Sequence, residues 1–232
     1  MNGTKSSRPI PLALTMLVAF FAALTALAVS NGHDAHAHGN PAAHAEHASA
    51  SQAALRSDMR ILWEDHITWT RLVIISLTTG SPDTTATVGR LLKNQTDIGN
   101  AVKPFYGKAA GNALTAELRK HILIAADVIA AAKAGDQAKL TDAQARWRSN
   151  ANDIAALLAK VNPRYWTQAQ MKAEMAMHLA LTTQEVVARL QGRWAADVAA
   201  YDEVHRHILH MSDVLADGLV KQFPDRFGDA GS

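Results

Sequence analysis

The chain has no cysteine among its 232 residues. This absence excludes disulfide bonds, thiolate metal sites, iron–sulfur clusters and haem attached through a CxxCH motif. The sequence also lacks a Gly-rich phosphate loop after a strand, a G-x-S-x-G elbow and an HExxH motif. The available site chemistry is therefore imidazole, thioether, carboxylate and amide, and no enzyme class is indicated. We expect a non-enzymatic protein.

The sequence also has no excess of basic over acidic residues, or of acidic over basic ones, outside its amino-terminal segment. The 23 basic and 21 acidic residues nearly balance, and without the first 29 residues, which contain Lys5 and Arg8, the balance is 21 to 21. A nucleic-acid surface needs clustered Lys and Arg to neutralise phosphates. We therefore expect no nucleic-acid partner.

The amino-terminal segment, residues 1–29, differs from the rest of the chain. Lys5 and Arg8 precede an apolar run over residues 10–29 that carries no charge, and Ala26-Leu27-Ala28 resembles a signal-peptidase site. The alternative is an uncleaved membrane anchor, since roughly 20 apolar residues can span a bilayer. Both interpretations predict export to the periplasm or the cell exterior, with membrane contact only through this segment.

Residues 30–50 are predicted to form a His-rich flexible linker, because Ala, Gly and Pro dominate and no core-forming pattern is present. Such tracts bind Cu²⁺, Ni²⁺ and Zn²⁺, so the segment is either a metal-gathering tail or a low-complexity tether. The histidines concerned are His33, His36, His38, His44 and His47.

The rest of the chain, residues 51–227, is predicted to be one all-α domain. Alanine is abundant and β-branched runs are scarce, which favours helix. Thr167 with Gln170 forms a capping box, and Asp83 is placed to cap another helix. Because the connections are short, we expect an antiparallel bundle of about six helices, with the bounds 51–79, 84–103, 108–134, 138–160, 168–191 and 194–223.

Histidines interrupt the apolar face of four of these helices. His66, His121 and His178 lie at buried positions near the middle of their helices, and His205 and His207 lie near the middle of the last one. His66, His121, His178 and His207 lie within about two residues of these midpoints, or roughly 3 Å at 1.5 Å per residue. The sequence thus predicts that imidazoles from separate helices converge in one layer.

Burying these groups without partners costs on the order of 1–3 kcal/mol each. Two explanations stay open: a bound transition metal, or a hydrogen-bonded polar network that only fixes helix register. The metal hypothesis draws its ligands from His66, His121, His178, His205 and His207. Four carboxylates are candidates to orient these ligands from behind: Glu64, Asp65, Glu185 and Asp202.

Copper or zinc is the expected ion. Imidazole suits both, and Met59, Met175 and Met211 add soft thioethers that favour copper, although methionine at helical spacing also serves as core filler. A ferritin-like di-metal site needs two Glu-x-x-His motifs, which the sequence lacks. Haem held by His or Met is a weaker alternative.

Four segments, with the sequences LWEDHITWTR (62–71), HILIAADVI (121–129), AYDEVHRHILHMSD (200–213) and QFPDRF (222–227), resemble a group of exported bacterial helical proteins of unestablished function. The resemblance covers residues 52–227. It implies export and a helical fold, and it implies no catalytic residues.

Overall fold

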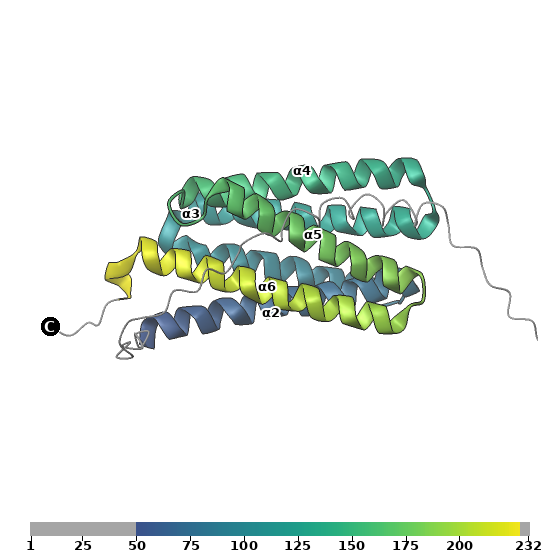
Figure 1. Cartoon of the computed structure of the whole chain (residues 1–232), viewed down its shortest axis with the longest axis horizontal. Coiled ribbons are helices and arrows are strands. Elements are labelled where there is room, and N and C mark those ends of the chain that lie inside the picture. The colour runs from purple at the N-terminus through teal and green to yellow at the C-terminus, as the bar shows by residue number, and fades with distance from the viewer. Residues whose placement is uncertain (1–49, 228–232) are drawn as a thin grey trace, which may run out of the picture.

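The computed structural model describes residues 50–227, and within them the fold is all-helical. The helices are gathered side by side into one bundle (Figure 1). This confirms the predicted helical class, whereas the amino-terminal segment and the His-rich linker lie outside the described residues. The elements are α2 (Ala50–Thr79), α3 (Thr84–Ala134), α4 (Gln137–Val161), α5 (Gln168–Leu190), α6 (Trp194–Gln222) and the short 3₁₀ helix η2 (Pro224–Arg226).

Residues 50–227 form five α-helices, α2 to α6, rather than the predicted six, because α3 covers both of the predicted helices 84–103 and 108–134. The difference arises at Gly107, whose φ of 82° and ψ of 171° interrupt the helical backbone. The two halves nevertheless touch, because Arg119 donates to the carbonyl oxygen of Leu92 at 3.0 Å. A straight helix would separate these residues by about 40 Å. The chain therefore doubles back at Gly107.

Glycine allows the two halves of α3 to approach closely. A β-carbon on Gly99 would lie 2.6 Å from the carbonyl oxygen of Gly111, and one on Gly111 would lie equally close to that of Gly99. No ordinary side chain fits at that distance. The first half of α3 consequently lies against α2, and the second half against α4.

The helix ends at Thr167 and Gly135 follow the expected cap chemistry, and the one at Asp83 does not. Thr167 accepts a hydrogen bond from the Gln170 backbone at 3.2 Å, as predicted. Gly135, with φ of 70°, ends α3 in the left-handed conformation that glycine adopts without strain. Asp83 occupies the predicted cap position, but its carboxylate accepts from the Ser76 hydroxyl instead of a helix amide.

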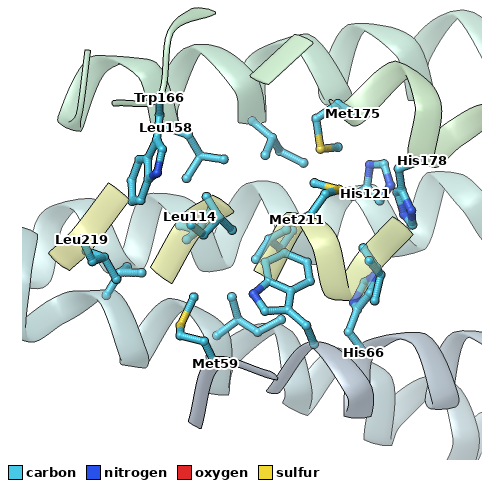
Figure 2. Close-up of a pocket in the computed structure, with 17 residues that line it drawn as sticks. Met59, His66, Leu114, His121, Leu158, Trp166, Met175, His178, Met211 and Leu219 are labelled. Atoms are coloured by element: carbon cyan, nitrogen blue, oxygen red, sulfur yellow. The ribbon is translucent and has the colours of Figure 1, made fainter. Parts of the chain in front are cut away.

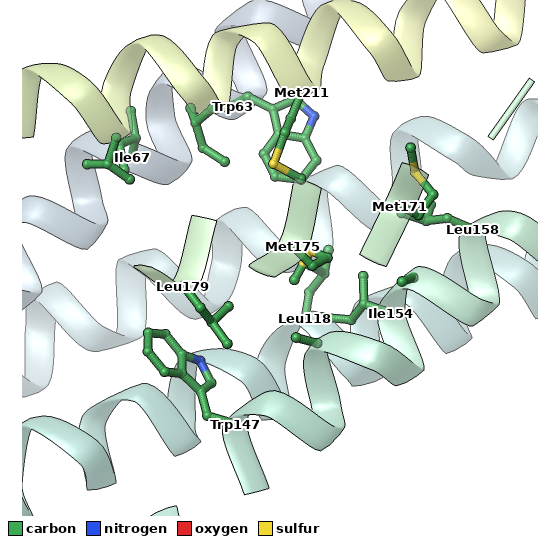
Figure 3. Close-up of a cluster of buried hydrophobic side chains, with 14 of the residues drawn as sticks. Trp63, Ile67, Leu118, Trp147, Ile154, Leu158, Met171, Met175, Leu179 and Met211 are labelled. Atoms are coloured by element: carbon green, nitrogen blue, oxygen red, sulfur yellow. The ribbon is translucent and has the colours of Figure 1, made fainter. Parts of the chain in front are cut away.

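One continuous apolar core receives side chains from all five helices. Figure 3 shows Trp63 and Ile67 of α2 facing Leu179 of α5 across this core, with Trp147 of α4 beside Leu179. Within residues 50–227, no helix is long and apolar enough to cross a membrane. Polar side chains that are buried in this apolar core therefore need an explanation.

Candidate functional site

Four imidazoles meet inside the bundle, and we call them the histidine layer: His66 of α2, His121 of α3, His178 of α5 and His207 of α6. The His178 ring lies between the others, with ring centroids 6.0 Å from His66, 6.0 Å from His121 and 6.3 Å from His207. Figure 2 shows the first three at one end of a core cavity. The predicted convergence of these four residues is confirmed.

Both ring nitrogens of His121 have partners. The indole Nε1 of Trp147 donates to His121 Nε2 at 3.2 Å. The proton of His121 is therefore on Nδ1, which donates to the side-chain oxygen of Asn150 at 2.8 Å. Asn150 in turn donates to Glu117. Burial lowers the pKa of His121 to about 4, so the ring is neutral at physiological pH.

His66 is also held as a neutral ring. The side-chain amide of Gln95 donates to His66 Nδ1 at 3.2 Å, which places the proton of His66 on Nε2. Asn94, next to Gln95 in the chain, donates to the Leu62 carbonyl at 2.9 Å and ties α3 to α2 at this level. Burial, reinforced by the neighbouring His121, lowers the pKa of His66 to about 3.

His178 is different, because its Nδ1 is buried and has no hydrogen-bond partner. The side chain is 5% exposed. Burial first, and then the three surrounding imidazoles, hold the pKa of His178 well below its usual value. His178 is therefore a neutral imidazole whose Nδ1 lacks the kind of hydrogen bond that Nδ1 of His121 makes.

His207 lies at the edge of the layer, with 11% of its side chain exposed. Its Nε2 donates to the backbone carbonyl of Glu174 at 3.1 Å, and its Nδ1 lies 3.8 Å from the carboxylate of the same residue. Burial lowers the pKa of His207, although the contacts with Glu174 oppose that shift. His210, one turn further along α6, lies 3.4 Å from the other oxygen of Glu174 and is 61% exposed.

His205 does not join the layer, contrary to its predicted place among the ligands. It lies near the surface and bonds to Glu64 at 2.7 Å, with its ring stacked on Tyr201. Residues 205 and 207 are about 200° apart around a helix, so they cannot face the same core. The five tail histidines lie outside the described residues.

The four candidate orienting carboxylates do not contact the histidine layer. Glu64 is engaged by His205, Asp65 pairs with Arg90, and Asp202 is exposed. Glu185 belongs to a separate charged group that the sequence does not reveal. Amides and an indole, instead of carboxylates, orient the imidazoles.

That charged group, the ion cluster, consists of Arg71, Glu185, Arg189 and Asp197. Arg71 of α2 donates one hydrogen bond to Glu185 at 2.8 Å and hydrogen bonds to both carboxylate oxygens of Asp197. Arg189 donates to Asp197 at 2.9 Å. Glu185 has no exposed side-chain surface, and its second oxygen has no partner. Burial raises the pKa of Glu185 to about 7, although Arg71 opposes that shift.

A cavity of about 30 Å³ lies beside the histidine layer, in the middle of the bundle. His66, His121 and His178 line one end of it, and Met175 and Met211 also line it. Figure 2 labels Met175 and Met211 among the side chains that surround this space. The space is thus bounded by imidazoles, thioethers and hydrocarbon.

The donor set decides which metals this interior can hold. Within residues 50–227, no group of three or more His, Asp or Glu side chains is arranged to hold a metal ion. Methionine, which supplies a thioether sulfur, is not one of these three residue types.

Comparison with known proteins gives no family: no family model matches the chain, and no curated protein or solved structure matches it significantly.

Proposed function

We propose that this protein is an exported, non-enzymatic helical bundle that binds one Cu(I) ion in its core. The ligands are Nδ1 of His178 and the thioether sulfurs of Met175 and Met211. The observation that carries the proposal is the buried, unpartnered Nδ1 of His178, a residue that lines a cavity together with Met175 and Met211. Export rests on the sequence of residues 1–29.

The donor chemistry supports Cu(I) over the other metals considered. Soft thioethers select Cu(I), whereas zinc takes four ligands from Cys, His, Asp and Glu. A cavity of about 30 Å³ has room for one or two water molecules and is far too small for haem. Copper is thus the member of the copper–zinc pair that this interior suits.

Protonation supports the same site. A metal competes with protons for an imidazole nitrogen, so a low pKa favours binding. The pKa of His178 is held well below its usual value by burial and by its neighbours. The ring of His178 is therefore neutral at physiological pH, and one of its two nitrogens carries a lone pair.

The proposal also concerns the direction in which each helix runs. We infer that successive helices alternate in direction, as the short connections at Gly80, Gly135 and Gly192 favour. Alternation keeps helix midpoints at one level and so keeps the ligands of α5 and α6 at the same depth.

The test is anaerobic titration of the full chain with Cu(I) against a coloured Cu(I) chelator, in a background whose five tail histidines are replaced by serine. We expect one equivalent to bind. The double variant Met175→Leu/Met211→Leu keeps similar side-chain volume and should weaken binding by at least about tenfold. Met177→Leu is the matched control, because Met177 lies on the same helix but is exposed.

X-ray absorption at the copper edge gives an independent readout, since the proposed site has two sulfur ligands and one nitrogen. Failure of the wild type to retain copper, or a spectrum without sulfur, contradicts the proposal.

A second candidate has its own supporting observations. His66, His121 and His207 are hydrogen-bonded to Gln95, Asn150 and the Glu174 carbonyl. These contacts suit a polar layer that fixes helix register and binds nothing. If this second candidate is right, adding Cu(I) changes the melting temperature of neither the wild type nor the Met175→Leu/Met211→Leu variant.

A further inference from the structure

Three side chains lead from the surface of α5 and α6 towards His178. His210 is 61% exposed, Glu174 is 17% exposed and His207 is 11% exposed. The His207 ring then stacks against His178, with 20° between the ring planes. Exposure thus decreases stepwise from solvent to the buried nitrogen of His178.

The electrostatics at Glu174 favour a cation. His207 uses its Nε2 proton on the Glu174 carbonyl, so a neutral His207 turns the lone pair of Nδ1 towards the Glu174 carboxylate at 3.8 Å. Two acceptors facing each other repel unless positive charge lies between them. His210 Nε2 lies 3.4 Å from the second carboxylate oxygen. Imidazole nitrogens and one negative charge therefore meet at this point of the surface.

We propose that Glu174, His207 and His210 form the entrance through which Cu(I) passes from solvent to His178. This inference rests on the proposed function. The two imidazoles exchange the ion, and the Glu174 carboxylate compensates its charge before the ion enters the apolar interior.

The arrangement suits transfer better than storage. Moving an uncompensated ion into an apolar interior is costly, so a path needs donors at short intervals, and the ring centroids of His207 and His178 are 6.3 Å apart. Residues 50–227 contain no group of three His, Asp or Glu side chains set to hold a metal tightly. An ion captured at the entrance is consequently not trapped there.

The test separates the rate of loading from the affinity of the site. The full chain, with its tail histidines replaced by serine, is mixed anaerobically with a coloured Cu(I)–chelator complex in a stopped-flow instrument, and the loss of colour is followed. Glu174→Gln removes the negative charge that attracts the ion, and His210→Ala removes the exposed imidazole that first binds it, so each should slow loading by about tenfold. The equilibrium stoichiometry should remain one ion per chain.

His205→Ala is the matched control, because His205 lies on the same helix and also pairs with a glutamate but is not part of the entrance. It should load at the wild-type rate. Wild-type loading rates in Glu174→Gln and His210→Ala overturn the entrance and leave the core site intact. A wild type that takes up no copper overturns the proposed function itself.

Discussion

The histidine layer and the ion cluster are both polar groups inside the bundle, and they meet the cost of burial in opposite ways. The layer is made of neutral rings, and burial lowers the pKa of His66 to about 3 and that of His121 to about 4. The ion cluster pairs two guanidinium groups with two carboxylates, and burial raises the pKa of Glu185 to about 7. Burial thus makes the layer histidines harder to protonate, whereas it makes Glu185 easier to protonate.

Geometry explains the difference. Each layer histidine comes from a different helix, and three of the four, His66, His121 and His207, meet amides, an indole or a carbonyl, which satisfy a neutral ring. In the ion cluster, Asp197 receives hydrogen bonds from both Arg71 and Arg189, which leaves Glu185 with Arg71 alone on one oxygen. Asp197 is the well-compensated carboxylate, and Glu185 is the one that titrates near neutrality.

The largest effect should come from breaking the ion cluster. Arg71→Ala leaves Glu185 and Asp197 buried with too few partners, and we expect it to reduce the free energy of unfolding by about 3–5 kcal/mol. Urea unfolding followed by circular dichroism measures the change. Arg60→Ala is the matched control, because Arg60 pairs with Asp213 at the surface and should lose less than about 1 kcal/mol. Equal losses in the two variants would show that the ion cluster contributes no more than a surface pair.

The second prediction concerns acid. Unfolded histidines take up protons near pH 6.5, whereas His66, His121 and His178 stay neutral when folded until the pH is far lower. The unfolded state therefore binds more protons between these values, and stability falls as the pH falls. Glu185 acts in the opposite direction, because between about 4.5 and 7 its folded state holds the extra proton.

The net loss between pH 6.5 and 5.5 should be about 2 kcal/mol in the wild type, and about 3 kcal/mol in Glu185→Gln, which keeps the side-chain shape but cannot titrate. Urea unfolding at each pH provides the measurement. A pH slope that is unchanged in Glu185→Gln would contradict the assignment of the opposing proton to Glu185.

Helix periodicity and the fixed rise per residue were enough to predict the helical fold and the convergence of His66, His121, His178 and His207. The phase of α6 was harder. Its buried face contains Val204, Ile208 and Met211, so Tyr201 and His205 turn to the edge. The sequence of one helix does not show which of two adjacent rows of side chains the neighbouring helices will cover.

The ion cluster and the surface entrance depend on packing between helices. Arg71 and Asp197 are 126 residues apart in the chain, and each resembles an ordinary charged residue on a helix. For the entrance, a signal did exist: His207 and His210 are three residues apart, and Glu174 lies one turn before His178. Their contact could be inferred only once α5 and α6 were known to pack together.

The smallest effect should come from the amide that holds His121 in place, and it tests whether neutral rings depend on their amide partners. Asn150→Ala removes the acceptor for His121 Nδ1–H and leaves that donor buried, which should cost about 1–3 kcal/mol. Asn112→Ala makes the same substitution at an exposed helical position and should change stability little. Because alanine favours helix over asparagine at both sites, the difference between the two variants isolates the lost hydrogen bond. If the two variants unfold at the same urea concentration, His121 does not rely on Asn150, and the contrast between a hydrogen-bonded layer and a charge-paired cluster loses its basis.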